Sequence, residues 1–379
     1  EPGLRDVLLR SKSRLKFSTD IKEAIENNDI IFSAVGTPEG ADGKPVMDFT
    51  ENVAKSVCQY ANRKKYLVLK STVPIGTAKN LKTLCEKESK HEVEIVSNPE
   101  FLREGVALTD FLKPDRVVVG CSTEKAQALM YEVYEAFLNS KDQMLFMDNA
   151  SAEMCKYAAN SFLATKISFM NEMSRLADYL DVDIEQVRLG IGMDARIGYS
   201  FIYPGCGYGG SCFPKDVKAF ASTAKKKNID LSIVNAVNKS NQDRINKISN
   251  KIISKIKNNS TVTFLGLSFK PNTDDVRDST SMKIASTIFE KGIKVQCYDP
   301  EAMDNAKKEN SNLILFNSAY EACEGSSAII IGTEWNEFRA LNFEKISKLL
   351  KEKIIFDLRN IYIPENLKEM GYEYYGTGK

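Results

Sequence analysis

Histidine is almost absent from this chain, which has one such residue, His91, among 379. His91 lies in a strongly charged stretch, residues 88–94, of the kind that forms a surface loop. A Ser-His-Asp hydrolase needs a histidine placed in its active site, and a histidine-rich metal site needs several histidines. The sequence therefore argues against both kinds of site. Acid–base chemistry then has to come from lysine, aspartate, glutamate, cysteine or water, and we predict no metal.

The sequence also lacks charge imbalance, long apolar runs and closely paired cysteines. A formal net charge of +1 gives no reason to expect nucleic acid or a membrane surface as a partner. No apolar run approaches the ~20 residues of a membrane span. The eight cysteines include no Cys-x-x-Cys pair, which favours a reducing compartment over a disulfide scaffold or a zinc site. We therefore expect a cytoplasmic protein.

Short apolar segments alternate with helical stretches in the first part of the chain, and this alternation is typical of a parallel sheet. Three of the segments end in polar turns, which contain Thr37, Thr72 and Glu100. Ligands bind outside the carboxyl ends of the strands in such sheets, so we expect the three turns to meet at one crevice. The expected strands are residues 30–35, 66–69, 92–96, 116–119 and 144–147.

A long helix is predicted from about Ser151 to Leu180, with Ser151 as its N-cap. Lys156 and Asn160 are four residues apart and therefore share one face of this helix. Most of their neighbours are apolar, and a lysine and an asparagine in such surroundings point into a site or an interface more often than into water. We expect the same helix to build a homodimer.

The last third of the chain predicts a second α/β unit, with strands at residues 261–265, 294–298, 313–316, 328–331 and 353–356. Two of these strands end in polar clusters, which contain Lys270 and Arg359. The fold class is therefore α/β, with two doubly wound domains joined by a long central helix and a helical middle domain. The predicted domain boundaries are residues 1–147, 148–257 and 258–379.

The most informative segment is a glycine-rich loop that ends in Cys212. Glycines let the backbone approach a ligand closely and leave the cysteine accessible. The ammonium group of Lys215 would favour the reactive thiolate, and Asp216 can orient a water molecule or a proton donor. A buried structural cysteine is the usual alternative for an isolated residue of this type, but these neighbours favour chemistry.

These segments together resemble the UDP-glucose/GDP-mannose dehydrogenase family of nucleotide-sugar 6-dehydrogenases, and the resemblance covers essentially the whole chain. It implies two Rossmann-like domains, the NAD-binding one first and the UDP-sugar-binding one last. It also implies that the enzyme oxidises C6 of UDP-glucose from alcohol to carboxylate with two NAD⁺. The motifs that carry the resemblance are Lys70-Ser-Thr-Val-Pro74, Asn98-Pro-Glu-Phe-Leu-Arg-Glu-Gly105, Lys156-Tyr-Ala-Ala-Asn160, Asp194-Ala-Arg196-Ile-Gly198, Gly207-Tyr-Gly-Gly-Ser-Cys212-Phe-Pro-Lys215-Asp216 and Phe269-Lys270 with Asp275-Val-Arg277.

The resemblance assigns covalent catalysis to Cys212, which would add to the C6 aldehyde and then carry the thioester. Lys156 and Asn160 would stabilise the developing oxyanion. The residues that would hold or activate the hydrolytic water are Glu100, Asp216 and Thr72. The residues assigned to NAD are Thr37, Thr72, Glu104, Lys215 and Arg277.

The residues assigned to UDP-glucose come from four stretches of the chain and from the long helix. Arg196 among them resembles an arginine that the family supplies from a partner subunit. The full set is Glu100, Phe101, Leu102, Arg103, Glu104, Lys156, Asn160, Arg196, Phe201, Ile202, Tyr203, Pro204, Gly205, Gly209, Phe269, Lys270 and Arg359.

One departure from the family pattern concerns the start of the sequence. The family begins with a strand, G-x-G-x-x-G and an acidic residue, whereas Glu1-Pro-Gly-Leu resembles the segment that follows them. We therefore expect this sequence to lack the first βαβ of the NAD domain and to reduce NAD⁺ poorly. The alternatives are a GDP-mannose or UDP-N-acetyl-mannosamine 6-dehydrogenase, a UDP-sugar-binding fragment without activity, and a thiol-based acyltransferase.

Overall fold

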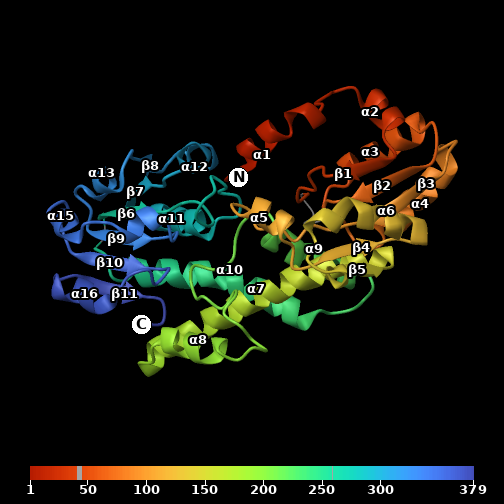
Figure 1. Ribbon diagram of the computed structural model, residues 1–379. Helices are drawn as coiled ribbons and strands as arrows, with labels where there is room; N and C mark the ends of the chain where they lie inside the picture. Colours follow the sequence, from red (N-terminus) through yellow and green to blue (C-terminus); the bar gives the residue numbers. More distant parts are fainter. Residues whose placement is uncertain (41–44, 258) are drawn as a thin grey trace. The chain divides into compact units, whose positions relative to one another are not determined.

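The computed structural model describes residues 1–40, 45–257 and 259–379. The chain divides into two compact units, one made of Glu1–Asn160 with Lys218–Asp230 and the other of Ser161–Val217 with Leu231–Lys379. Each unit is built on its own sheet (Figure 1). The divisions fall inside two helices, α7 and α9, whose bounds are Asn149–Leu180 and Phe213–Lys225.

The first unit contains a five-stranded sheet of order β1-β2-β3-β4-β5. The predicted strands are confirmed to within two residues at each end. β1, β2 and β3 run parallel, as do β4 and β5, but β3 and β4 pair antiparallel through Ser97 and Gly120 alone. The expectation of a wholly parallel sheet is wrong at this pair, where the last residue of β3 pairs with the last residue of β4 and only the short helix α5 lies between the two strands in sequence. The strands are β1 Ile30–Ser33, β2 Lys65–Leu69, β3 Val93–Ser97, β4 Val117–Gly120 and β5 Met144–Met147.

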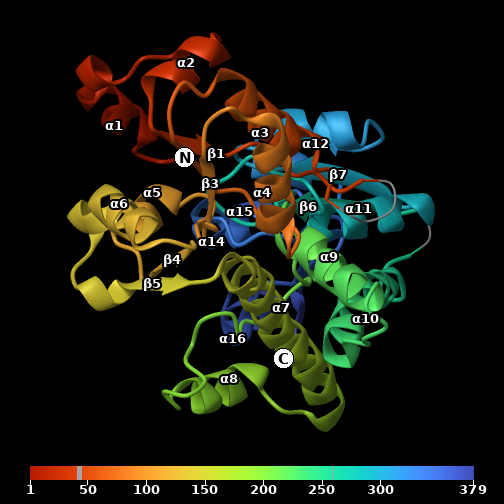
Figure 2. The same cartoon turned by 90° about the vertical axis from the view of Figure 1, so that its right-hand side faces the viewer.

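Helices cover this sheet and join its strands. The helices α3 and α4 pack against each other beside β2 and β3 (Figure 2). Their apolar faces and the buried strands form one core that includes Leu67 and Leu81, so α4 is held firmly behind the turn that contains Thr72. The helices are α1 Leu4–Arg10, α2 Ile21–Asn27, α3 Asp48–Tyr60, α4 Thr77–Glu88, α5 Ala107–Leu112 and α6 Glu124–Tyr134, with short 3₁₀ turns at Lys12–Arg14, Glu135–Phe137 and Lys141–Gln143.

The long helix α7 begins two residues before its predicted start and ends at Leu180 as predicted. Its N-cap is Asp148 and not Ser151. The Asp148 carboxylate accepts from the Ser151 backbone N–H at 2.9 Å and from the Ser151 Oγ–H at 2.6 Å. These hydrogen bonds lower the pKa of Asp148, and a carboxylate at this end of a helix also complements the helix dipole.

The second unit contains a six-stranded, wholly parallel sheet of order β11-β10-β9-β6-β7-β8. This is the doubly wound order in which the first three strands, β6, β7 and β8, extend one way from β6, and the next three extend the other way from it. The five predicted strands are confirmed, whereas β11 has no expected counterpart. The strands are β6 Thr261–Leu265, β7 Lys294–Tyr298, β8 Ile314–Leu315, β9 Ala328–Ile331, β10 Ile354–Asp357 and β11 Glu373–Gly376.

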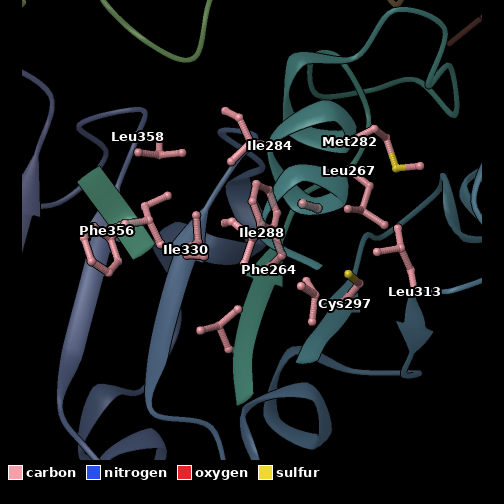
Figure 3. Packing of buried hydrophobic residues seen from close by; sticks show 14 of the residues in the cluster. Phe264, Leu267, Met282, Ile284, Ile288, Cys297, Leu313, Ile330, Phe356 and Leu358 are labelled. Carbon is pink, nitrogen blue, oxygen red and sulfur yellow. The ribbon is translucent and has the colours of Figure 1, made fainter. Parts of the chain in front are cut away.

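Buried side chains from neighbouring strands of this sheet form one apolar cluster. Phe264, Ile330 and Phe356 come from β6, β9 and β10, and they lie against Ile284 and Ile288 of α11 (Figure 3). This core fixes the carboxyl ends of the strands, where the polar turns begin. The helices are α8 Ile184–Gly192, α10 Ser232–Ile253, α11 Thr280–Glu290, α12 Met303–Glu309, α13 Ala319–Cys323, α14 Asn336–Arg339, α15 Phe343–Ser347 and α16 Pro364–Glu369.

Candidate active site

The three polar turns of the first sheet lie side by side, as predicted. Thr37 Oγ1 donates to the backbone carbonyl of Thr72 at 3.0 Å, and Ser71 Oγ donates to that of Val35 at 2.5 Å. Lys70 Nζ donates to Asn98 Oδ1 at 3.3 Å and so joins the second turn to the third. The carboxyl edge of β1, β2 and β3 is therefore one polar surface.

Lys156, which is buried, and Glu100, which is half-buried, form an ion pair at this edge. The Lys156 ammonium lies 3.0 Å from Glu100 Oε1, and the other carboxylate oxygen of Glu100 accepts from the Leu102 N–H at 2.6 Å. The ring of Phe101 lies 5.3 Å from Lys156 Nζ and 3.9 Å from the Arg116 guanidinium. Two predicted catalytic residues thus meet in a shielded environment, where charge–charge interactions are stronger than in water.

Lys70 is a member of this cluster that sequence reasoning did not single out. Its ammonium lies 5.8 Å from the ring centroid of Tyr134, whose hydroxyl donates to Asn98 Oδ1 at 2.6 Å. The pKa of Lys70 is lowered to about 8, mainly by burial and also by the nearby Lys156 ammonium, against an opposing effect of Glu100. The motif that contains Thr72 begins at Lys70, so the sequence did carry a signal for this residue.

Glu153, on the first turns of α7, is a second residue that the sequence analysis missed. Its carboxylate accepts from the backbone N–H groups of Gly76 at 2.6 Å and Ala78 at 2.8 Å, and so caps α4 from another helix. Burial raises the pKa of Glu153, against the effect of these hydrogen bonds. A cavity of about 10 Å³ lies among Thr72, Glu153 and Lys156, which is about the space that one water molecule needs.

The remaining predicted residues of the first unit differ in how far they are buried. Thr37 and Thr72 are buried, and Leu102 and Glu104 are half-buried. Arg103 is largely exposed, and its guanidinium pairs with Asp110 at 2.7 Å on the surface.

In the second unit, Cys212 is exposed and immediately precedes α9. Its backbone carbonyl accepts from the Asp216 N–H at 2.9 Å, which places Cys212 at the helix N-terminus. The Lys215 ammonium lies 3.3 Å from Asp216 Oδ1, and the Asp216 side chain is almost fully buried.

The glycine loop before Cys212 is fixed by hydrogen bonds from three residues of α7 and α10. Asn241 Oδ1 accepts from the Tyr208 N–H at 2.8 Å, and its Nδ2 donates to the Tyr208 carbonyl at 2.9 Å. Asn171 Oδ1 accepts from the Gly205 N–H at 2.8 Å, and Arg244 Nε donates to the Gly205 carbonyl at 3.0 Å. Sequence reasoning missed all three, because none of them lies within a motif of the sequence.

Two glycines in this loop allow a close approach of backbone to neighbouring groups. A Cβ at Gly209 would lie 2.5 Å from the Asp278 carbonyl oxygen. A Cβ at Gly210, where φ is +83°, would lie 2.6 Å from the ring of Phe269. The loop is therefore packed against the turn that contains Phe269, and a side chain at either position would displace it.

Arg359 lies at the carboxyl end of β10, where its Nε donates to the Gly332 carbonyl at 2.7 Å. Within residues 161–217, 231–257 and 259–379, its Nη2 is buried without a hydrogen-bond partner. A Cβ at Gly205 would come within 3.1 Å of Nη1, so the loop and this guanidinium adjoin. A buried N–H group of this kind suits an anionic ligand that would complete its hydrogen bonds.

The other predicted residues of the second unit surround this loop or lie on the surface. The rings of Phe201 and Phe213 are 6.0 Å apart, and Lys270 Nζ lies 5.0 Å from the ring of Phe269. Tyr203 stacks on the Arg188 guanidinium at 4.2 Å, and Ile202 and Pro204 are buried. Arg277 pairs with Asp275 at 2.6 Å, and Arg196, whose side chain is 89% exposed, pairs with Asp194.

The polar edge of the first sheet fits a nicotinamide dinucleotide. The Thr72 hydroxyl and the Lys70 ammonium are suitable donors to its ribose, phosphate and carboxamide groups, and the Thr37 hydroxyl, which donates to the Thr72 carbonyl, can accept from the ligand. Across the described ranges 1–40, 45–257 and 259–379, no group of three or more His, Cys, Asp and Glu side chains could hold a metal ion. Over the same ranges, no helix has both the length and the apolar character needed to cross a membrane.

Three regions of the chain match known domains in order. Residues 1–138 match an NAD binding domain, residues 150–243 a central domain and residues 263–364 a UDP binding domain. The chain is thus an oxidoreductase, a dehydrogenase with two Rossmann-like domains and a helical middle region. It belongs to the UDP-glucose/GDP-mannose dehydrogenase family.

Relatives at moderate identity extend over nearly the whole chain. UDP-glucose 6-dehydrogenase of Rickettsia bellii is 39% identical over 371 residues, which are 96% of this chain and 85% of that protein. The Pseudomonas aeruginosa enzyme of the same name is 38% identical over 395 residues, 100% of this chain and 87% of that protein. The solved structure of a UDP-glucose dehydrogenase from Pyrobaculum islandicum has a TM-score of 0.90 at 35% identity and covers 100% of this chain and 87% of that one.

Proposed function

We propose that this dehydrogenase oxidises UDP-glucose at C6 to UDP-glucuronate in two steps, each with one NAD⁺. The observation that carries the proposal is the exposed Cys212 at the N-terminus of α9, on a loop that Asn171, Asn241 and Arg244 fix in place. An accessible thiol in a rigid position is what covalent capture of an aldehyde needs. The names of the relatives support the choice of substrate.

Each oxidation removes a hydride from C6, which NAD⁺ accepts when it is bound at the polar edge of the first sheet. The Cys212 thiolate adds to the aldehyde between the two oxidations and holds it as a thiohemiacetal, which the second oxidation converts to a thioester. Lys156 and Asn160 donate hydrogen bonds to the C6 oxygen as negative charge develops there. That Lys156 and Asn160 act on the same C6 group as Cys212 is itself part of the proposal.

Hydrolysis of the thioester requires one positioned water molecule. Glu100, Asp216 and Thr72 are the groups that we assign to hold it and accept its proton. The ion pair of Glu100 with Lys156 supports this assignment, because it links the water-holding carboxylate to the group that stabilises the oxyanion. Binding of NAD remains assigned to Thr37, Thr72, Glu104, Lys215 and Arg277.

Binding of the nucleotide sugar is assigned mainly to the second unit. The partnerless Nη2 of Arg359 supports a role in binding the diphosphate, and Lys270 supplies a further positive charge at the end of β6. We assign further contacts with the nucleotide sugar to the stretch Phe201 to Gly205, to Gly209 and to Phe269. We assign contacts with the sugar itself to Phe101, Leu102 and Arg103. Arg196 is assigned to the site of a partner subunit in a homodimer.

The proposal is tested by turnover on three nucleotide sugars. We expect UDP-glucose to be oxidised faster than GDP-mannose or UDP-N-acetyl-mannosamine, with two NADH formed for each sugar consumed. NADH is followed by absorbance and the acid product by mass spectrometry. A higher rate on GDP-mannose or UDP-N-acetyl-mannosamine would show that this sugar nucleotide, and not UDP-glucose, is the substrate. Binding of UDP-glucose without NADH formation would support a binding protein.

The domain boundaries and the cytoplasmic location stay predictions.

A further inference from the structure

Two cysteines away from the candidate active site lie against each other inside the first unit. Cys58 is in the last turn of α3 and Cys85 in the last turn of α4, and their Sγ atoms are 3.0 Å apart. Both side chains are buried, at 4% and 3% exposure. Since the S–S bond of a disulfide is about 2.05 Å long, the sulfurs need to approach by only about 1 Å to become bonded.

A cavity leads from the surface to this pair. Its volume is about 660 Å³, and Cys85 is among the residues that line it, together with Ser89, His91, Thr123 and Asp148. The cavity walls are of mixed polar and apolar character, and several polar side chains among them allow water and small polar solutes to enter. This cavity is the route that our proposal gives to a small oxidant in the folded protein, since Cys85 is one of its lining residues.

The contact between the two thiols also changes their acidity. Burial, together with the nearby Glu94 carboxylate, raises the pKa of the Cys121 thiol to about 11. In the pair, the hydrogen bond with Cys85 lowers the pKa of Cys58, while the same contact and burial raise the pKa of Cys85. The contact thus favours Cys58 as the sulfur that gives up its proton first, while its partner Cys85 keeps its own.

We propose that Cys58 and Cys85 are an oxidation site, where hydrogen peroxide or a similar small hydroperoxide forms a reversible disulfide in the folded protein. The ionised sulfur attacks the peroxide, the O–O bond breaks, and a sulfenic acid and hydroxide form. The hydroxide takes up a proton and leaves as water. The second sulfur gives up its proton and displaces the sulfenic oxygen, which leaves as a second water molecule. The two thiols lose two electrons, and these reduce the peroxide.

The disulfide would join the ends of α3 and α4 across a sequence separation of 27 residues. A cross-link of this span restricts the unfolded chain, so the oxidised form should melt at a higher temperature than the reduced form. The site is chemically separate from Cys212, whose thiol is exposed and lies in the second unit.

The test is peptide mapping of the folded protein after treatment with hydrogen peroxide. Free thiols are blocked with N-ethylmaleimide, and the protein is digested without reduction. We expect a linked peptide pair that contains Cys58 and Cys85, lighter by two hydrogens, and a raised melting temperature. Dithiothreitol should reverse both. Cys121, which is 7% exposed, should stay reduced under the same conditions.

The variants Cys58→Ala and Cys85→Ala should each lose the linked peptide and the shift in melting temperature. Cys323→Ala, which removes a buried thiol from the second unit, should keep both and is the matched control. Absence of the linked peptide in the wild-type protein, in a sample where Cys212 is already oxidised, would overturn the proposal. So would a rate of cross-linking that rises with the unfolded fraction as urea is added, because the cavity would then not be the route.

Discussion

At the scale of single residues, Cys212 should decide the chemistry. We expect Cys212→Ser to lower the rate of UDP-glucuronate formation by a factor on the order of 10³ or more, because a hydroxyl is not ionised at neutral pH and cannot replace the thiolate. Binding of UDP-glucose should change little. Product formation is measured by mass spectrometry and binding by calorimetry.

Cys206→Ser is the matched control, since it removes a second thiol from the same loop. Cys206 is fully buried, and its Sγ lies 3.6 Å from the Gly332 carbonyl oxygen. We expect this variant to lose some thermal stability and to keep turnover within a few-fold of wild type. If Cys212→Ser retained the turnover of this control, the covalent mechanism would be wrong.

Lys70 makes the stability of the first unit depend on pH. Its pKa in the folded protein is about 8, against an ordinary value of 10.5, so between these values the unfolded chain binds the extra proton. The free energy of unfolding should therefore rise as the pH increases from 8 towards 10.5, by at most about 3 kcal/mol from this residue.

Urea denaturation at pH 7 and pH 10 measures this effect. The rise should be smaller in Lys70→Met than in wild type, because the buried charge is absent at both pH values. Lys79→Met removes an exposed lysine from α4 and should leave the rise unchanged. Equal pH dependence in wild type and Lys70→Met would show that Lys70 keeps its ordinary pKa.

Residue types at fixed spacing made part of the candidate site predictable. The motifs that contain Cys212, Lys156 and Glu100 indicate their chemistry from residue type and spacing alone. The structure then places Lys156 and Glu100 in an ion pair at 3.0 Å. Asn241 and Glu153 were not predictable, because each acts through a partner far away in the chain. A polar residue on a helix looks the same in sequence whether it faces water or caps another element.

At the scale of elements, α7 presents an apolar stripe. Phe162, Phe169 and Leu176 follow each other at intervals of seven residues, which is two helical turns, and each is more than half exposed. We propose that a second copy of the chain covers this stripe in a homodimer. Phe169→Lys should then shift the protein to a monomer, because it places a charge in the interface.

Light scattering coupled to size exclusion measures this change. Ile314→Lys places the same charge on another exposed apolar residue, on β8, and should leave the mass unchanged. A wild-type monomer with full activity would contradict the proposal.

Strands were predictable where a short apolar run stands between polar turns, as in β6 and β9. The strand β11 was missed because Glu373-Tyr-Tyr-Gly376 contains no such run. The antiparallel pairing of β3 with β4 was missed for a different reason, since it depends on where the connecting chain passes and on one pair of residues. The Asp148 cap was missed by a shift of three residues, a usual uncertainty for helix ends.

At the scale of the whole molecule, the two nucleotide ligands should depend on different units. We expect Arg359→Met to weaken binding of UDP at least about tenfold, since a buried cation would no longer meet the diphosphate. The ammonium and hydroxyl groups of the first unit are unchanged by this substitution. Calorimetry with UDP alone measures the effect.

Arg339→Met, which changes an exposed arginine of α14 in the same unit, should bind UDP like wild type. Equal UDP affinity in Arg359→Met and Arg339→Met would show that Arg359 does not bind the diphosphate. Loss of folding is detected separately by circular dichroism.

The capping of α4 by Glu153 also has a consequence for the order in which the first unit folds. The hydrogen bonds from Gly76 and Ala78 to Glu153 join residues 77 and 75 positions apart, whereas β2, α4 and β3 are neighbours in sequence. Contacts that close long loops form late, because their entropic cost must first be met by other interactions. We therefore expect the turn that carries Thr72 to gain hydrogen-exchange protection only when α7 docks, well after the sheet beneath it has formed.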